Sequence, residues 1–170
     1  MTSAGPNSTG SKKGITRILG IDPGTRVVGY GIIEIQGSRL RCTEAGAFRV
    51  AASVALPIRL ARISAGLRSL VEKHEPDAVA MEDAFVAKDP GAALKIGAGR
   101  GAILAVLGER EFDVASYPPA TIKKAVAGNG RASKEQVARM VTAILGLAAA
   151  PDSLDATDAL AVAITHALRI

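Results

Sequence analysis

Four acidic residues of this sequence have types and positions that could do chemistry together. Asp22 and Glu82 each follow a short apolar run of the kind that forms a buried strand. Asp155 and Asp158 stand three residues apart where a C-terminal helical segment begins, so they project from one face. Because sites in open α/β sheets tend to form at strand ends, three distant segments could bring four carboxylates to one place.

Four carboxylates cannot share a small volume while ionised unless cations neutralise them. Magnesium suits sites made of oxygen ligands and keeps waters and phosphate oxygens as its remaining ligands. Two such ions, roughly 3.5–4 Å apart, can activate a water and stabilise the departing oxygen of a phosphodiester. The pattern therefore predicts two Mg2+ ions per site, with Mn2+ as an alternative. The predicted reaction is an in-line hydrolysis of a phosphodiester by a metal-bound water.

Each acid also has an ordinary structural interpretation. An aspartate in the first turn of a helix, such as Asp155 or Asp158, commonly offsets the helix dipole. Asp22 precedes a Pro-Gly pair and could simply begin a turn. Glu82 is the strongest of the four signals, because a carboxylate that ends an apolar strand is costly unless it is paired or exposed.

The elements that must position these acids begin with five runs of apolar and β-branched residues, each bounded by turn residues. A glycine–serine pair at 37–38 offers a hairpin turn between the second run and the third. Three strands in hairpin order, followed by alternating helices and strands, predict an α/β fold with a five-stranded mixed sheet flanked by helices. The predicted strands cover residues 17–21, 27–35, 40–50, 78–81 and 112–117.

Four further segments carry helical periodicity. In the second of them Gly97 and Gly101 share a face, which allows close approach of another backbone and makes this face a candidate dimer interface. The proline pair at 118–119 predicts the end of the fifth strand. The predicted helices run over 56–73, over 90–107, from a capping box at Ser133 and Gln136 until Pro151, and from 153 or 154 to about 168.

Length and composition bound the class of protein. A chain of 170 residues, 48% of them hydrophobic, can bury one core, so we expect a single domain over 15–170 after a flexible tail at 1–14. No apolar run reaches the roughly 18 residues of a membrane-spanning helix, and the tail lacks a secretory signal. The single Cys42 excludes an internal disulfide and a cysteine cluster for zinc. We therefore expect a soluble cytoplasmic protein, and its net charge of +5 favours a polyanionic partner.

Three blocks of sequence carry more information than the acids alone: ILGIDPGTRVVGYGIIE, MEDAFVAKDPGAALKIGAGRGAI and DATDALAVAITHAL. Together they resemble the RuvC family of bacterial Holliday-junction resolvases, over residues 18–168. The resemblance implies a ribonuclease-H-like fold, a homodimer, and paired symmetric nicking of four-way junction DNA. It also implies a branch-migration helicase of the RuvA/RuvB type as a partner. The catalytic acids of the family fall on Asp22, Glu82, Asp155 and Asp158.

The resemblance also assigns residues that would contact DNA. Phe85 matches an aromatic residue that contacts unpaired bases at the junction centre, although an isolated phenylalanine is more often part of a core. Lys123 and Lys134 match basic residues near the DNA backbone and the scissile phosphate. Arg131 and Arg139 flank Lys134, and these three form either a phosphate-contacting surface or a solvated helix face.

Two more polar residues near the acids have open roles. His166 lies two turns beyond Asp158 and is either an outer-shell group of the metals or a plain helix residue. Asp83 follows Glu82 at a position where an amide is common in the family. Adjacent side chains of a strand point to opposite faces, so we expect Asp83 to lie away from the metals. The proline pair leaves the placement of Lys123 open.

Three other functions fit parts of the sequence. A ribonuclease of the same fold that processes structured RNA would use similar acids. An ATP-binding domain of the actin and sugar-kinase type has an Asp-x-Gly phosphate loop near a strand end, as at Asp22. Such enzymes clasp the nucleotide between two domains, however, and this chain supplies one. A junction-binding protein without catalysis would not need four acids, and cleavage on added magnesium would distinguish it.

Overall fold

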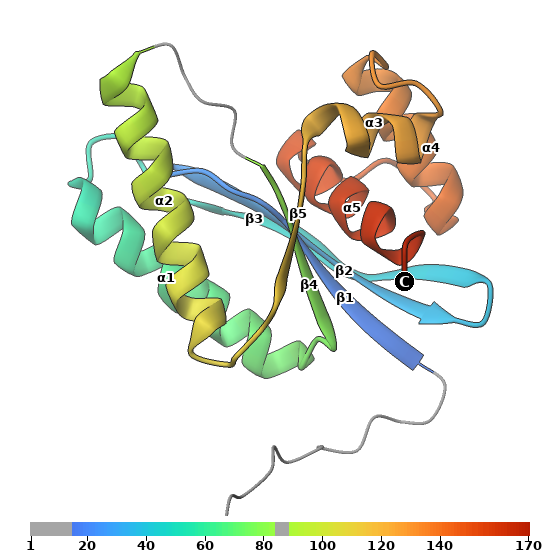
Figure 1. Cartoon of the computed structure of the whole chain (residues 1–170), viewed down its shortest axis with the longest axis horizontal. Coiled ribbons are helices and arrows are strands. Elements are labelled where there is room, and N and C mark those ends of the chain that lie inside the picture. The colour runs from blue at the N-terminus through green and yellow to red at the C-terminus, as the bar shows by residue number, and fades with distance from the viewer. Residues whose placement is uncertain (1–14, 84–88) are drawn as a thin grey trace, which may run out of the picture.

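The computed structural model of the chain describes residues 15–83 and 89–170 (Figure 1). Its strands are β1 (Ile15–Asp22), β2 (Val27–Gln36), β3 (Arg39–Arg49), β4 (Ala78–Glu82) and β5 (Val114–Tyr117). They form one sheet in the order β3-β2-β1-β4-β5. The first three pair antiparallel, whereas β4 is parallel to β1 and β5 is parallel to β4. The predicted α/β fold with a five-stranded mixed sheet is confirmed.

Helices cover both faces of this sheet. They are α1 (Leu56–His74), α2 (Pro90–Gly108), α3 (Pro119–Ala127), α4 (Lys134–Leu145) and α5 (Leu154–Ala167). Figure 1 shows α1 and α2 on one side of the sheet and α3, α4 and α5 on the other. Each side buries its own apolar cluster against the strands. The sheet therefore separates two hydrophobic cores, as is expected for a layered α/β domain.

Side chains of the two central strands alternate between these cores. In β1, Ile18 packs in the cluster of α3, α4 and α5, whereas Leu19 and Ile21 pack in the cluster of α1 and α2. In β4, Ala80 belongs to the first cluster and Met81 to the second. Because the side-chain period of a strand is two, the acidic residue that ends each strand points to the α5 side.

Close packing of α5 on the sheet depends on glycines in β1 and β2. A Cβ atom built on Gly20 would lie 2.2 Å from the carbonyl oxygen of Ala159, and one built on Gly29 would lie 2.0 Å from that of Asp155. Any larger residue at these positions would push the helix away. These glycines therefore set the distance between the sheet and the first turn of α5.

Helix α3 was not predicted from the sequence, because the proline pair there indicates a chain break. The pair does end β5, but Pro118 is the N-cap and Pro119 opens the helix, where a missing N–H costs nothing. The helix ends at Gly128, whose φ of 74° suits the left-handed conformation that follows many helices. This helix carries Lys123 and packs between α4 and α5.

The small-residue face of α2 differs from expectation. No described atom lies within 4 Å of a Cβ built on Gly97 or Gly101, so this face makes no close approach within the described chain. The buried Gly99 makes the close approach instead, because a Cβ built on it would lie 3.0 Å from the carbonyl oxygen of Gly24. By length and composition α2 could also cross a membrane, although only 22% of its apolar window is buried and one such helix is weak evidence.

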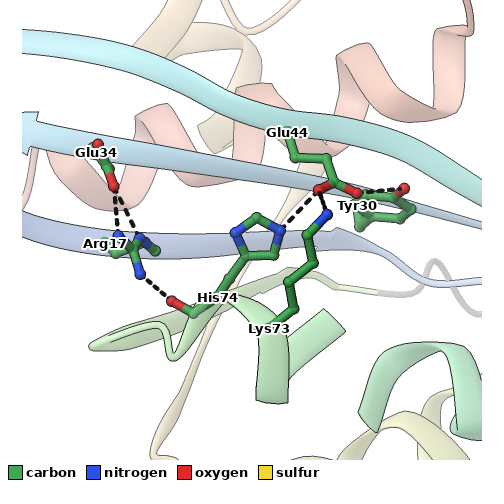
Figure 2. A network of polar contacts seen from close by, with 6 residues as sticks. All are labelled: Arg17, Tyr30, Glu34, Glu44, Lys73 and His74. Atoms are coloured by element: carbon green, nitrogen blue, oxygen red, sulfur yellow. Dashed lines mark hydrogen bonds and ion pairs between the residues drawn. The ribbon is translucent and has the colours of Figure 1, made fainter. Parts of the chain in front are cut away.

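A network of hydrogen bonds and ion pairs connects the C-terminal end of α1 to β1, β2 and β3 (Figure 2). His74, which is buried, places Nε2 2.8 Å from the carboxylate of Glu44 on β3. Lys73 donates to the same carboxylate, and the hydroxyl of Tyr30 lies 3.3 Å from it. Arg17 on β1 donates to the main-chain oxygen of His74, so the helix end is held by both main-chain and side-chain bonds.

Candidate active site

Asp22 and Glu82 end neighbouring parallel strands. Ile21 pairs with Met81 in the sheet register, so the next residue of each strand lies at the same edge. The alternation described above points both side chains toward α5. In open α/β sheets, binding sites commonly lie just outside the carboxyl ends of the strands.

The other two acids come from the first turns of α5. Ser153 caps this helix by accepting a hydrogen bond from the main-chain N–H of Ala156. The cap and the contact at Gly29 hold the first turn against β2, with Asp155 close to the sheet and Asp158 one turn further on. The helix start thereby delivers two carboxylates to the ends of β1 and β4.

A cavity of about 320 Å³ lies where these elements meet. Three of the four acids line it, together with two lysines. Its apolar wall comes from α3, α4 and α5, and α3 is the helix that the sequence did not predict. The full lining is Asp22, Glu82, Pro119, Ile122, Lys123, Lys134, Val137, Asp158 and Ala161.

Crowding of negative charge dominates the electrostatics of this cavity. The pKa of Asp22 is raised from 3.8 to about 7, first by burial and then by the carboxylates of Glu82, Asp158 and Asp155, while Lys134 opposes them. Burial also raises the pKa of Glu82, with Asp158 as the next cause. Oxygen donors that repel one another in a partly buried place fit a divalent cation, which would neutralise them.

Two of the acids already have cationic partners. The Nζ atom of Lys134 lies 3.4 Å from Asp158 Oδ2, and Arg49 Nη2 lies 2.8 Å from Asp155 Oδ2. Asp155 is therefore turned toward Arg49 at the end of β3 and does not line the cavity. Across residues 15–83 and 89–170, no three acidic, histidine or cysteine side chains surround one point closely enough to hold an ion in this arrangement.

Of the other residues predicted to act at the site, only some line the cavity. Lys123 and Lys134 line the cavity, whereas Arg131 is exposed beside α4 and does not. Phe85 lies outside the described residues. His166 does not line the cavity either: its Nδ1 lies 2.8 Å from the Tyr117 hydroxyl, and burial lowers its pKa.

Two arginines near the acids were missed by sequence reasoning. Arg49 pairs with Asp155, and Arg100 on α2 pairs with Asp83 at 3.2 Å, which places Asp83 away from the cavity. An arginine at a strand end or inside a helix has no local signal that marks it, because its partner comes from a distant segment. Charge alone could not have identified either residue.

Comparison with known proteins identifies the family of this chain. The family model described as crossover junction endodeoxyribonuclease RuvC matches residues 18–166. The RuvC protein of Acinetobacter baylyi is 49% identical over 150 residues, which are 88% of this chain and 82% of that protein. The RuvC protein of Halorhodospira halophila is 48% identical over 153 residues, which are 90% of both chains.

Among solved structures, Thermus thermophilus RuvC in complex with Holliday junction substrate matches with a TM-score of 0.84 and 35% identity. The match covers 89% of this chain and 93% of that one. It confirms the ribonuclease-H-like fold implied by the resemblance in sequence. The matching family model, the relatives and the shared fold all lead to one assignment: this chain belongs to the RuvC family of crossover junction endodeoxyribonucleases.

Proposed function

We propose that this chain is a structure-specific endonuclease that resolves Holliday junctions in DNA recombination and repair. It cuts two equivalent strands of a four-way junction by hydrolysis of their phosphodiesters. One observation carries the proposal: the cavity sets three carboxylates, Asp22, Glu82 and Asp158, opposite two lysines. The carboxylates suit divalent cations, and the lysines suit the phosphate that those cations would bring in.

We assign Asp22, Glu82, Asp155 and Asp158 as the residues that hold two Mg2+ ions, with Mn2+ as an alternative. Bound ions would activate a water molecule and would stabilise the negative charge on the departing 3′ oxygen. The products would be a 5′-phosphate and a 3′-hydroxyl. Asp155 faces Arg49, so a turn of its side chain toward Asp22 would bring it to the same ions. The raised pKa of Asp22 supports the assignment: burial is its largest cause and repulsion from the other carboxylates adds to it, and a bound cation would offset both by stabilising the ionised form.

The chain's own cations act on the substrate. Lys134 stands beside Asp158, and its pKa is raised by that carboxylate foremost, so it stays charged in the neutral range. A positive charge there would stabilise the negative charge that grows on the attacked phosphate. Lys123 lines the other side of the cavity from α3 and would hold the same strand. Phe85 is proposed to contact unpaired bases, as the family resemblance implies, and the exposed Arg131 is proposed to contact a DNA phosphate.

The proposed enzyme is a homodimer, because a four-way junction presents two equivalent strands and a two-fold dimer presents two equivalent sites. The exposed face of α2 is the proposed interface. Leu94 is 78% exposed and Leu104 is 38% exposed, and Gly97 and Gly101 lie between them along the same face. Two such faces could approach closely, since glycines place no side chain between the backbones. A branch-migration helicase of the RuvA/RuvB type is the proposed partner, in the cytoplasm.

Strand-specific cleavage of a synthetic mobile four-way junction tests this function. Wild type and Asp22→Asn would be compared in EDTA, Mg2+ and Mn2+, with duplex DNA and an RNA–DNA hybrid as control substrates. We expect symmetric paired nicks on the junction alone, lost in Asp22→Asn while junction binding persists. An uncut junction in both metals would refute the proposal, and degradation of the hybrid would then favour an RNA-processing nuclease.

A further inference from the structure

The peptide unit that follows Glu82 is held on both sides. The N–H of Asp83 donates to the carbonyl oxygen of Tyr117 at 2.9 Å. The carbonyl oxygen of Glu82 accepts a hydrogen bond from Nη1 of Arg100, also at 2.9 Å. Both groups belong to one planar unit, so bonds at its two ends fix the plane. The direction of the Glu82 side chain depends on this backbone, because the strand ends here.

Arg100 is itself firmly placed. Its Nη2 donates to the hydroxyl of Ser116 at 2.8 Å and lies 3.2 Å from Oδ1 of Asp83. Its side chain is 23% exposed, so these contacts are partly shielded from water. The planar fork of an arginine can serve three acceptors at fixed angles, which a lysine cannot do. Arg100 thereby joins α2 to the ends of β4 and β5.

The residue before Arg100 explains how α2 comes close enough. Gly99 is buried, and a Cβ on it would lie 2.8 Å from the Thr25 side chain and 3.0 Å from the carbonyl oxygen of Gly24. Gly24 and Thr25 belong to the turn that follows Asp22. Helix α2 therefore contacts the chain directly after one acid and binds the main chain of another.

We infer that Arg100 is a positioning residue for the cleavage reaction. By holding the carbonyl oxygen of Glu82 it aims the Glu82 carboxylate at Asp22 and Asp158. Arg100 does not line the cavity, so its effect passes through Glu82. The inference rests on the proposed nuclease function and deepens it, and it gives Asp83 a role as the charge partner of Arg100.

The test compares Arg100→Met and Arg100→Lys with the control Arg68→Met. Arg68 also joins two elements, by a bidentate pair with Glu109, but it does so far along α1, away from the cavity. Four quantities are measured: single-turnover cleavage of the junction, junction Kd in Ca2+, Mn2+ binding by calorimetry, and the melting temperature. Mn2+ binding reports on the site even where no DNA is cut.

We expect Arg100→Met to lose about 10- to 100-fold in cleavage rate and several-fold in Mn2+ affinity, the usual effect of losing a group that orients a metal ligand. Its junction Kd should stay within about twofold, since phosphate contacts are untouched. Arg100→Lys should recover part of the rate, because one donor can still reach the Glu82 carbonyl. Arg68→Met should cut and bind Mn2+ as wild type does.

Cleavage and Mn2+ binding at the wild-type level in Arg100→Met would overturn the inference. So would a loss shared equally by Arg68→Met, which would indicate general weakening of α2. If Arg100→Met does not fold, Ser116→Ala removes one contact of Arg100, and a rate within twofold of wild type would then overturn the inference. A wild type that binds Mn2+ without cutting any junction would instead refute the proposed function, and the Mn2+ affinity of Arg100→Met would still decide the positioning role.

Discussion

The Nζ atom of Lys134 lies 3.4 Å from Oδ2 of Asp158, and both residues line the cavity. Lys134 is the first residue of α4 and directly follows Ser133, the N-cap residue of the capping box. Its backbone is therefore held firmly, while its side chain is 61% exposed and can turn from the carboxylate to a phosphate. This pairing suggests that Lys134 exchanges one anionic partner for another when DNA binds.

Replacement of Lys134 by methionine should lower the rate of junction cleavage by roughly 10²–10³-fold, because a preorganised charge at the reacting phosphate is lost. Junction Kd in Ca2+ should rise only modestly. Lys124→Met is the matched control, since Lys124 is exposed on α3 and does not line the cavity. Single-turnover assays measure both variants, and equal losses of rate in the two would contradict the assigned role.

Asp22 should make the stability of the metal-free protein depend on pH. Its pKa is raised in the folded state from 3.8 to about 7, with burial as the largest cause. The pKa of Asp22 is higher in the folded state than in the unfolded state. The contribution of Asp22 to the free energy of unfolding is therefore fully present below about pH 3.8 and is lost as pH rises through about 7.

Asp22→Asn should therefore be more stable than metal-free wild type, by a margin that grows by about 2 kcal/mol from pH 5 to pH 8. Urea unfolding in EDTA measures this margin. Added Mg2+ should stabilise wild type much more than the variant, since binding to the folded state alone raises its stability. A margin that does not change with pH would show that Asp22 titrates normally.

Gly29→Ala should separate α5 from the sheet. The new Cβ would meet the carbonyl oxygen of Asp155 at 2.0 Å, and a main-chain atom cannot move aside cheaply. We expect a loss of about 2–3 kcal/mol in unfolding free energy. Cleavage should also fall, because Asp155 and Asp158 shift together. Gly108→Ala, at a position with nothing within 4 Å, should change neither quantity appreciably, and a tolerated Gly29→Ala would refute this account of the packing.

Glu44 should contribute stability that disappears in acid. Hydrogen bonding from Lys73 is the largest cause that lowers its pKa, and His74 adds to it (Figure 2). The pKa of Glu44 is lower in the folded state than in the unfolded state. Glu44 therefore stabilises the fold fully above its unfolded pKa of 4.5, and this stabilisation is lost as pH falls through its folded pKa.

Glu44→Gln should be less stable than wild type by about 1 kcal/mol at neutral pH, with the difference shrinking below about pH 4. Thermal unfolding across pH measures it, and junction cleavage should be unaffected because the network lies on the α1 side of the sheet. Glu72→Gln is the control, since Glu72 is 61% exposed in its pair with Arg110. An equal effect in both variants would mean that the partly buried network around Glu44 stabilises the fold no more than an ordinary surface pair does.

Much of the candidate site could be predicted from the sequence because the rules that govern it are local. Period-two alternation in a strand decides which way Asp22 and Glu82 point once the apolar residues before them are buried. Capping by Ser153 starts α5 at a definite residue, and that start places Asp155 and Asp158. The mixed sheet likewise follows from strand lengths, a hairpin turn and alternating helices.

Other features depend on segments that meet only after folding. The sequence alone did not show α3, because a proline pair can end one element or begin the next, and only the space between α4 and α5 selects the helix. Tertiary structure also decided that Asp155 faces Arg49 while Asp158 enters the cavity. One partner of Arg100 is the main-chain carbonyl of Glu82, and because every residue possesses such a group, no sequence pattern can reveal this bond. Distances between elements far apart in the chain set these pairings, and local propensity carries no information about such distances.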